Sequence, residues 1–595
     1  MKNYKTRNDV PEKYKWDLTE YFTDEKDFNE NYEKALKLVS KLKEYSGATK
    51  DANRLYEFIK LDEEASSIIE NLYAYTYLVN DQELGIPSSM QNKNKIENLI
   101  AEYEANIAFF SPELLKLNND EYNKLFEKPE LLDYKLMLDK IYRAKEHILH
   151  EENEEIISRL TLSMNHFDDI SSNMLNACHN YGTVKVNDET ITLTPTNYRK
   201  IMKNSDEFFR KNTYEQFSKV LKQYSIISAS LLDSYVKMNS TNAKIHNFKS
   251  SWDNKLFYSN MSNEVYKTLV KNVEANAASY QRYLNLLKKV HHLSELHTYD
   301  LNLNLISFEK EYSIEETQKL ILNAISVLGT EYKAKFKKIY DEKYIDYASY
   351  KGKCSGGYSI STSTKNSRIL LSFNGDLSSV STIAHEGGHN VHHQFVKENN
   401  PIQYREVTSL VSEVASLTNE CLLSSYIAKN GKTKGEKLAG IANIIDVMNS
   451  NLFGAVREGK IEQDFYEKVD KGGTITNDYM EKLTIDSFKK YYGDIVKLDE
   501  YSGTSWIRRS HYYMFFYLYA YSICIVIASY IASEILKGNQ NVLEKYIEFL
   551  KTGADKWPLE AFSILGVDLT NDDVYIGAIK YYNSLLDEFE KLMEE

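Results

Sequence analysis

Cysteine and proline are scarce in this chain, and each scarcity excludes a class of structure. The four cysteines occur without C-x-x-C spacing, which excludes a disulfide framework and favours reduced, intracellular thiols. Only seven prolines and 23 glycines occur in 595 residues, and no low-complexity linker or internal repeat of solenoid length interrupts the chain. With so few helix-breaking residues, we predict a mainly α fold.

An excess of positive charge is also absent. Lys and Arg total 73 against 86 Asp and Glu, which gives a net charge of −13. No basic patch is interleaved with aromatic residues, so we expect no nucleic-acid partner. The first residues, Met-Lys-Asn-Tyr-Lys-Thr-Arg-Asn-Asp, lack the apolar core of a signal peptide. Together with the thiols, this predicts a cytoplasmic location.

Helical periodicity is what the sequence has in abundance. Apolar residues recur at helical spacing over four long stretches, residues 26–130, 150–178, 206–240 and 262–293. The segment Val184–Pro195 differs, because its β-branched residues favour a small β-element. We predict a domain boundary there, with a helical lobe over residues 1–190 and a second domain over residues 200–595.

The most informative segment is His385-Glu-Gly-Gly-His389, an H-E-x-x-H motif. Positions four apart share one face of a helix, so both histidines can reach one zinc ion. Glu386 then lies where it can act as a base toward water on the metal. Upstream, residues 368–373 favour a short buried strand, and Asp376 is the predicted N-cap of the helix.

Two glycines, Gly387 and Gly388, lie inside this predicted helix. Each should cost about 1 kcal/mol relative to alanine. We therefore expect another backbone, either of the metal site or of a substrate strand, to approach the helix at this point.

A catalytic zinc site needs a third protein ligand. A second helix is predicted from Glu406 to Lys429, packed antiparallel to the first. Glu413 on this helix is the predicted third ligand, and Glu406 is the competing candidate. Glu420, two turns after Glu413, would orient a ligand histidine through its other ring nitrogen, or else lie on a solvated helix face.

Two further histidines, His392 and His393, follow the motif. They lie one and two turns beyond the ligand pair, too far along the axis to complete a tetrahedron. We predict that they lie on the helix face or behind the ligands.

The sequence resembles the thimet oligopeptidase family of zinc metallopeptidases, and within it the bacterial oligoendopeptidase F branch. The H-E-G-G-H motif followed 24 residues later by Glu413 carries this resemblance. Three other segments support it, Val10–Leu18, Gly352–Ser359 and Trp506–Tyr521. The chain departs from the family pattern at Cys354, where Arg is expected, and at Ser510, where Pro is expected. Neither departure removes a proposed catalytic group, but Cys354 affects the segment expected to contact substrate.

The resemblance implies an almost all-helical, two-lobed body that encloses a deep substrate channel, with residues 200–595 as the catalytic domain. We also expect a small β-element near the active site. It implies that residues 355–359 present a strand edge to the substrate, with Ser355, Gly356, Gly357 and Tyr358 as contact residues. It also implies that His511 and one or two nearby tyrosines contact the substrate or the oxyanion.

The segment around His511 is dense in tyrosine. Zinc-assisted peptide hydrolysis builds a tetrahedral oxyanion, which neutral donors such as Tyr O–H or His N–H can stabilise. Tyr513, Tyr517 and Tyr521 fall at steps of four, which predicts one helical face. We favour Tyr521 and then Tyr517 for the oxyanion, with Tyr513 near the substrate. Simple packing remains the alternative for each tyrosine, because the chain contains 47 of them.

Residues 514–536 carry only one charged residue, Glu534. This run is long enough to span a bilayer. However, it is rich in Tyr and Ser, and no Lys/Arg-biased loops accompany it. We therefore predict a buried helix and no membrane partner.

These observations predict a zinc-dependent endopeptidase that binds one zinc ion and hydrolyses short, unstructured peptides. The alternatives are an exopeptidase of the same class that releases dipeptides, a silent peptide-binding scaffold, and a membrane-associated metalloprotease. Structural zinc sites use four protein ligands, so a set of three disfavours the scaffold.

Overall fold

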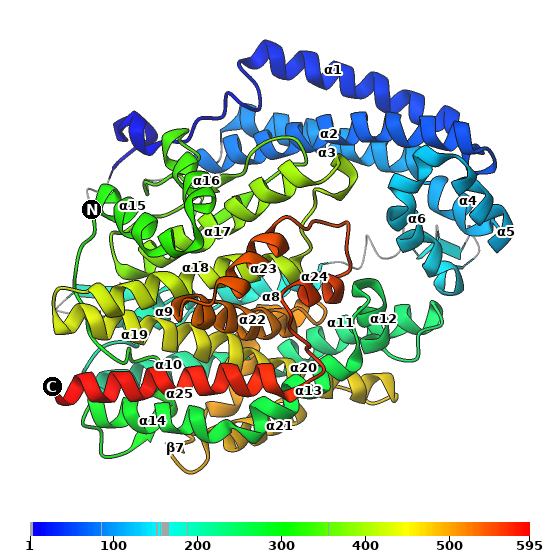
Figure 1. Cartoon of the computed structure of the whole chain (residues 1–595). Helices are drawn as coiled ribbons and strands as arrows, with labels where there is room; N and C mark the ends of the chain where they lie inside the picture. The colour runs from blue at the N-terminus through cyan, green and yellow to red at the C-terminus, as the bar shows by residue number, and fades with distance from the viewer. Residues whose placement is uncertain are drawn as a thin grey trace. The chain divides into compact units, whose positions relative to one another are not determined.

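The computed structural model confirms the mainly α fold (Figure 1). Helices make up most of the described chain, and each strand has two to four residues. The structure describes residues 4–84, 86–149, 153–154, 156–157, 166–186, 189–350, 352–354 and 356–595.

The chain forms two compact units, and each is assembled from three separated stretches. Unit 1 combines Met1–Glu146, Glu309–Tyr426 and Ile531–Gly566. Unit 2 combines His147–Phe308, Ile427–Tyr530 and Val567–Glu595. This division differs from the single boundary near residue 190 predicted above, because elements distant in sequence pack together.

Three helices form the N-terminal part of unit 1, α1 (Glu25–Leu42), α2 (Ala52–Gln82) and α3 (Pro87–Ile107). They pack side by side in Figure 1. Asp24 and Asp51 begin α1 and α2 as N-caps, because each side chain accepts from a free N–H of the first turn. The shorter helices that follow are α4 (Phe110–Lys116), α5 (Asn119–Lys124) and α6 (Lys135–Tyr142).

The second part of unit 1 contains a three-stranded sheet of order β4-β6-β5. Its strands are β4 (Ile345–Asp346), β5 (Tyr358–Ile360) and β6 (Arg368–Leu370), the last within the strand predicted at residues 368–373. β4 is parallel to β6, and β5 is antiparallel to it with Ser359 opposite Ile369. β5 is thus an edge strand. Among the helices of this part, α17 (Leu377–Asn399) packs on β5 and β6, and α16 (Thr330–Asp341) packs on α17 and on α15 (Ile314–Ala324). α23 (Gln540–Leu550) also packs on α17, and α24 (Pro558–Ile564) packs on α23.

Contacts between α2 and the sheet region tie the stretches of unit 1 together. Asn71 in α2 donates to Oγ1 of Thr364 (2.8 Å) and accepts from Oγ1 of Thr362 (2.7 Å). Asn71 and Thr362 lie almost 300 positions apart, so no sequence periodicity relates them. These bonds fix the loop after β5 to α2.

Unit 2 begins with α8 (Phe167–Asn173) and a β-hairpin of β1 (Thr183–Val186) and β2 (Glu189–Thr192). The hairpin confirms the β-element predicted at Val184–Pro195. Helices make up most of the remainder, with a short parallel pair of β3 (Leu296–His297) and β7 (Val496–Lys497). These helices are α9 (Pro195–Ile201), α10 (Glu207–Gln223), α11 (Ser225–Ile245), α12 (Ser251–Ser259), α13 (Asn263–Ala275), α14 (Ala277–Val290), α19 (Lys434–Met448), α20 (Ala455–Asp470), α21 (Asn477–Tyr492) and α25 (Asp572–Glu594).

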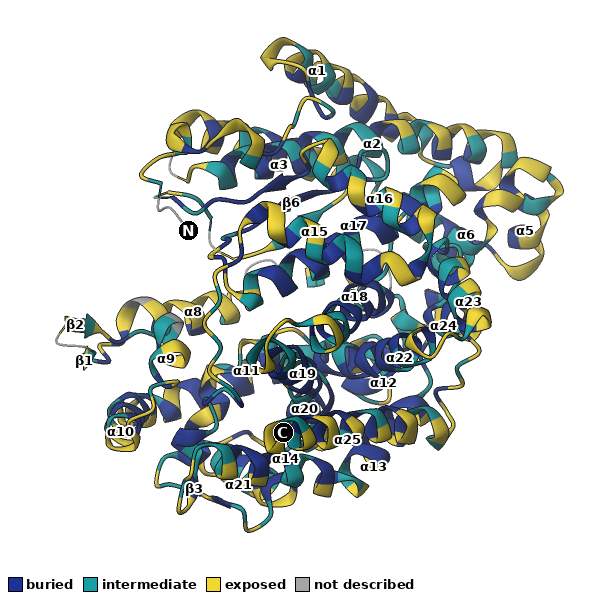
Figure 2. Cartoon of the chain, turned by 60° about the vertical axis from the view of Figure 1, so that its left-hand side comes forward, coloured by how far each residue is buried: buried dark blue, intermediate teal, exposed yellow. Residues whose placement is uncertain are grey.

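The apolar run near the C-terminus forms α22 from Leu518 onward (Leu518–Leu536), and 78% of an 18-residue window of this helix is buried inside the structure (Figure 2). By length and composition α22 could cross a membrane, but the buried core helices of soluble proteins meet the same criteria. Tyr513 and Tyr517 precede α22, so the expectation of one helical face for Tyr513, Tyr517 and Tyr521 is wrong. Phe515 and Phe516 have φ values of 42° and 54°, which interrupt the helical path between Tyr513 and α22.

Candidate metal centre

α17 carries the H-E-x-x-H motif on its buried part. Asp376 is its N-cap, as predicted, and its side chain accepts from the N–H of Ser379 (2.8 Å). With 3.6 residues per turn, His385 and His389 fall on one face, and their ring centroids lie 4.9 Å apart.

The two glycines of the motif permit close packing on both sides of α17. A Cβ at Gly388 would lie 2.8 Å from the carbonyl oxygen of Ala415 and 2.8 Å from Cα of Ser416. A Cβ at Gly387 would lie 2.2 Å from the ring of Phe336 in α16. The backbone that approaches the motif helix at Gly388 is therefore that of α18 (Ser409–Asn430), the helix that carries Glu413.

α17 and α18 run antiparallel, as predicted. Ser381 in α17 contacts Glu420 in α18, and His389 contacts Glu413, so the two chain directions are opposed. Asn419 reinforces this contact by donating to the carbonyl oxygen of Ala384 (3.1 Å). α18 begins at Ser409 rather than at Glu406, which leaves Glu406 in the loop before the helix.

Three side chains converge on one point between these helices. Nε2 of His385 lies 3.4 Å and Nε2 of His389 lies 3.6 Å from Oε2 of Glu413. The three ligating atoms all lie within 4.8 Å of one another. Tetrahedral zinc with bonds of 2.0–2.2 Å separates neighbouring ligand atoms by about 3.4 Å. The donor set and its spacing therefore fit a zinc ion.

Two hydroxyls and a carboxylate hold these ligands from behind. Nδ1 of His385 donates to Oε1 of Glu420 at 2.6 Å, and Ser381 donates to the other oxygen of Glu420 (2.9 Å). Oε2 of Glu413 accepts from the hydroxyl of Ser416 (2.9 Å). A carboxylate on Nδ1 fixes the tautomer that leaves Nε2 free for a metal.

Burial and carboxylate charge set the protonation of the two motif histidines. Burial lowers the pKa of His385, but the hydrogen bond to Glu420 and the charges of Glu420, Glu413 and Glu386 outweigh it and raise the pKa to about 9. Burial, followed by the charge of His385, lowers the pKa of His389 to about 4. The carboxylates thus create a site that attracts positive charge, which a divalent cation would supply.

Glu386 is almost fully buried, 8% exposed, beside the converging ligands. Burial raises its pKa to about 7; His385 opposes this shift, whereas Glu413 and Glu420 reinforce it. A carboxyl group that titrates near neutral pH can both accept and return a proton.

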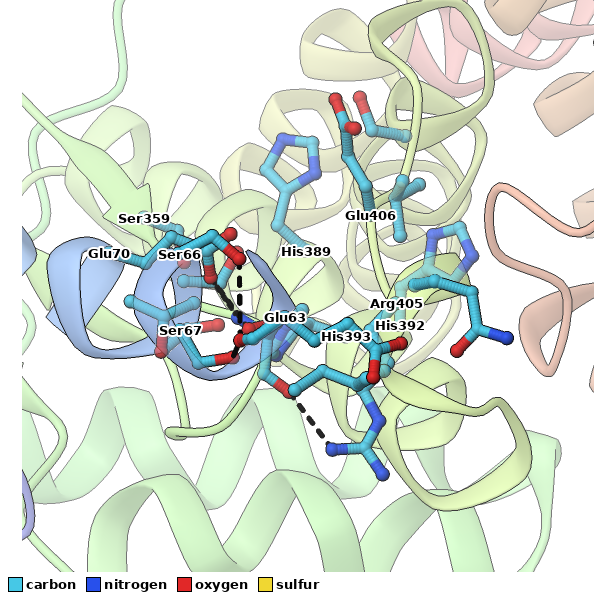
Figure 3. A pocket seen from close by; sticks show the side chains of 18 of the residues that line it. Glu63, Ser66, Ser67, Glu70, Ser359, His389, His392, His393, Arg405 and Glu406 are labelled. Atoms are coloured by element: carbon cyan, nitrogen blue, oxygen red, sulfur yellow. Dashed lines mark hydrogen bonds between the residues drawn. The ribbon is translucent and has the colours of Figure 1, made fainter. Parts of the chain in front are cut away.

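A pocket with a volume of about 510 Å³ adjoins the ligands within unit 1 (Figure 3). His389 and Glu413 line it, and so does Glu406, which is not among the three converging ligand residues. Its far wall comes from α2 and includes acidic and serine side chains, namely Asp62, Glu63, Ser66, Ser67 and Glu70. No local sequence signal identifies this wall, because only tertiary packing brings α2 to the site.

His392 and His393 also line this pocket. His392 is 1% exposed, and its ring centroid lies 5.7 Å from that of Phe549. Burial lowers the pKa of His392 to about 3 and that of His393 to about 4, so both rings are neutral at pH 7. A supporting role for His392 at the metal site stays a prediction.

The segment expected to contact substrate leads into edge strand β5. Gly356 has a φ of 101°, a conformation that favours glycine, and Gly357 packs against Thr382 of α17. The hydroxyl of Tyr358 donates to Oδ2 of Asp81 (2.8 Å), so this side chain is directed to α2. Ser359 lines the pocket, and Ser355 lies outside the described residues.

The predicted oxyanion donors belong to unit 2 and are described within it. The ring of His511 lies 6.1 Å from that of Tyr521, and the rings of Tyr521 and Tyr517 lie 5.2 Å apart. Tyr513 packs against Tyr235, with its backbone oxygen accepting from the Tyr235 hydroxyl (2.8 Å). Unit 2 thus groups His511, Tyr517 and Tyr521, whereas Tyr513, at the end of the 3₁₀ turn that carries His511, packs against α11. Their contact with substrate stays a prediction.

Comparison with known proteins accounts for nearly the whole chain. Residues 200–581 match peptidase family M3, and residues 113–178 match the oligopeptidase F N-terminal family. The chain is 28% identical to group B oligopeptidase PepB of Streptococcus agalactiae, over 99% of this chain and 98% of that protein. It is 30% identical to an oligoendopeptidase F homolog of Borreliella burgdorferi, over 99% of this chain and all of that protein.

Solved structures show the same fold. A protein from Chlamydophila abortus superposes with a TM-score of 0.90 at 24% identity, covering 99% of this chain and 100% of that one. Oligoendopeptidase F from Enterococcus faecium gives a TM-score of 0.73 at 23% identity, covering 96% of this chain and 100% of that one. The chain therefore belongs to peptidase family M3, in its oligoendopeptidase F branch, and is a metalloendopeptidase acting on oligopeptides.

Proposed function

We propose that His385, His389 and Glu413 hold one zinc ion, and that the enzyme uses it to cut internal bonds of short, unstructured peptides. The observation that carries this proposal is the convergence of the three ligating atoms beside the buried carboxyl of Glu386. Catalytic zinc sites commonly have three protein ligands and one open position.

Zinc, when bound, would supply Lewis acidity and lower the pKa of water from about 15.7 toward about 7. Glu386 would accept a proton from the attacking water and deliver it to the leaving amine, since its pKa of about 7 suits both steps. Glu420 would keep the ring of His385 oriented through Nδ1.

His511 and Tyr521, with Tyr517 as the second choice of tyrosine, would donate hydrogen bonds to the developing oxyanion. Burial and the charge of Arg509 lower the pKa of His511, against the opposing charge of Glu458. His511 is therefore a neutral ring with one N–H to donate at pH 7. Such donors contribute most when they are fixed before the charge develops.

The substrate backbone would pair with the free edge of β5. This pairing uses main-chain groups, so it binds extended peptides with little dependence on side chains. The pocket behind Ser359 would then receive a substrate side chain. Folded proteins do not present an extended strand, and we propose that the enzyme leaves native proteins uncut.

The proposed setting is the cytoplasm, with peptides as partners and neither nucleic acid nor membrane. Recovery of the protein only with detergent would contradict the part of this proposal that concerns membranes.

The decisive experiment is cleavage of internally quenched peptides capped at both ends, compared between the wild type and Glu386→Gln. Each protein is assayed with and without a chelator, and its zinc content is measured. We expect turnover by the wild type alone, lost to the chelator and restored by zinc, with equal zinc content in both proteins.

The other outcomes are equally informative. Cleavage of uncapped peptides only would replace attack on internal bonds with removal of terminal dipeptides. Loss of zinc from Glu386→Gln would mean that Glu386 supports the metal and not proton transfer. Peptide binding by the wild type with no turnover would favour a silent scaffold.

A further inference from the structure

The segment that carries His511 is held in a conformation that its residues do not favour. Between the short 3₁₀ turn Ser510–Tyr513 and the start of α22, Phe515 and Phe516 have φ values of 42° and 54°. A bulky residue in the left-handed region is uncommon, and two in succession require surrounding contacts that hold them there. Such strain is concentrated at functional sites, where neighbouring contacts must hold the strained residues in place.

One support is Glu462 in α20. The backbone N–H of Phe516 donates to Oε1 of Glu462 at 2.7 Å, inside the core of unit 2. Glu462 is 1% exposed and Phe516 is 3% exposed. The ring of Phe516 packs on those of Trp252 and Tyr466, with centroid distances of 4.8 and 4.4 Å. Glu462 thus accepts the N–H that the left-handed turn directs into the core.

A second support is Glu458, one helical turn before Glu462. The hydroxyl of Tyr512 donates to Oε2 of Glu458 at 2.6 Å. Arg457 and Arg509 donate to its other oxygen, at 2.6 and 3.3 Å. Tyr512 and Arg509 flank His511, at one position after it and two before it. Glu458 therefore fixes the chain on both sides of His511.

The two carboxyl groups differ in charge. Burial alone would raise the pKa of Glu458, but Arg509, Arg457 and the Tyr512 hydroxyl lower it to about 2. Burial raises the pKa of Glu462 to about 8, against the Phe516 N–H and Lys255. The other ionisable groups that face Glu462 are the phenols of Tyr235, Tyr266 and Tyr466. At pH 7 the Glu458 anchor is ionic, whereas Glu462 accepts its hydrogen bond as an uncharged acid.

Local helix geometry presents both groups to the segment. Residues Asn449–Gly454, directly before α20, form a π-helical turn. π-turns rotate the helix face that follows and occur frequently at functional sites. In α20, positions 458 and 462 then share one face.

We propose that Glu458 and Glu462 are positioning residues for peptide hydrolysis: they hold residues 509–517 in the strained conformation that orients His511. This inference rests on the proposed role of His511 as a donor to the reacting carbonyl. Both glutamates are buried in the core of unit 2 and act through residues 509–517, so their loss should lower kcat and leave KM and zinc binding nearly unchanged.

The test compares Glu462→Leu with Glu462→Gln. Leu removes the acceptor for the Phe516 N–H, and we expect kcat to fall by up to about 100-fold, the loss that a displacement of about 1 Å can cause. Gln keeps an uncharged acceptor of the same length, so we expect it to restore most of the lost kcat. Zinc content and KM should match the wild type in both variants.

Tyr512→Phe tests the Glu458 anchor and leaves Glu458 paired with Arg457 and Arg509. This variant also tests the inference if Glu462→Leu does not fold. The matched control is Tyr575→Phe, since Tyr575 is a fully buried tyrosine of unit 2 whose hydroxyl donates to the backbone oxygen of Leu569 (2.7 Å). We expect kcat to fall in Tyr512→Phe and not in Tyr575→Phe.

Unchanged kcat in both Glu462→Leu and Tyr512→Phe would overturn the inference. So would equal losses in Glu462→Leu and Glu462→Gln, because the acceptor would then not be what matters. His511→Phe distinguishes failure of the proposed role of His511 from failure of the positioning inference. If this variant retains full kcat, the proposed role of His511 fails, whatever the other variants do. If it loses kcat while neither Glu462→Leu nor Tyr512→Phe does, only the positioning inference fails.

Discussion

Gly388→Ala tests whether the metal site depends on the close approach of α17 and α18. The added Cβ would lie 2.8 Å from both the carbonyl oxygen of Ala415 and Cα of Ser416, well inside the 3.4–4 Å of an ordinary contact. Both obstructing atoms belong to the backbone of α18 and cannot rotate away. The clash is relieved only if the two helices separate, which would move Glu413 away from the motif histidines.

The expected magnitude follows from two opposing effects. Overpacking of a core contact costs about 1–3 kcal/mol. Replacing glycine by alanine inside a helix stabilises the folded state by about 1 kcal/mol. Because the obstruction is backbone, we expect the cost to lie near its upper end, which leaves a net destabilisation of about 2 kcal/mol. For a unit of this size, that lowers the thermal midpoint by about 3 °C.

The assay is thermal unfolding of the metal-free protein, so that zinc affinity does not contribute to the midpoint. Competition with a chelator then measures zinc affinity separately, and we expect it to be weaker in the variant. Gly577→Ala is the matched control, because Gly577 lies inside α25 and an added Cβ would meet no atom within 4 Å. That control should gain about 1 kcal/mol. If Gly388→Ala melts at or above the wild-type temperature and binds zinc equally well, the close-packing argument is refuted.

Three further predictions concern single carboxyl groups. Glu413→Gln should weaken zinc retention in a chelator competition, whereas Glu406→Gln should not, since Glu406 lies outside the converging ligand set; the reverse result would move the third ligand. Glu420→Gln replaces a charged partner of His385 Nδ1, and should lower zinc affinity about 10- to 100-fold; unchanged affinity would remove Glu420 from the site. Glu462 has a folded-state pKa near 8, above its ordinary 4.5, so folding takes up a proton and wild-type stability falls as pH rises from about 4.5 to about 8. Glu462→Gln has no carboxyl group at this position, so its stability does not fall in this way. The difference in thermal midpoint between the variant and the wild type should therefore rise between pH 5 and 8 and then level off. A difference in midpoint that stays constant with pH would contradict the raised pKa.

Much of the metal centre could be predicted because its parts are local. The i, i+4 spacing of His385 and His389 puts them on one face in any α-helix, and Asp376 begins that helix whatever packs against it. The apolar periodicity also predicted a second helix that packs antiparallel to the first. Its start was misplaced by three residues, because the loop before Ser409 is fixed by its surroundings and not by periodicity.

Other features could not be read from local pattern. The steps of four from Tyr513 to Tyr521 predicted one helical face, yet Phe515 and Phe516 leave the helix. Nothing in these residues favours a left-handed turn; Glu462, more than 50 positions earlier, supplies the hydrogen bond that supports it. The division into two units is similar, since each unit gathers stretches that are remote in sequence.

The sequence by itself determined the helical class of the fold, the motif helix, and the chemistry of the residues on its face. These depend on periodicity and spacing, which act over one or two helical turns. Only the tertiary structure decided that Gly388 is needed against the backbone of α18, that Glu420 meets Nδ1 of His385, and that α2 closes the pocket beside His389. Those facts depend on the distance between segments far apart in the chain, and a distance in space has no local signature in sequence.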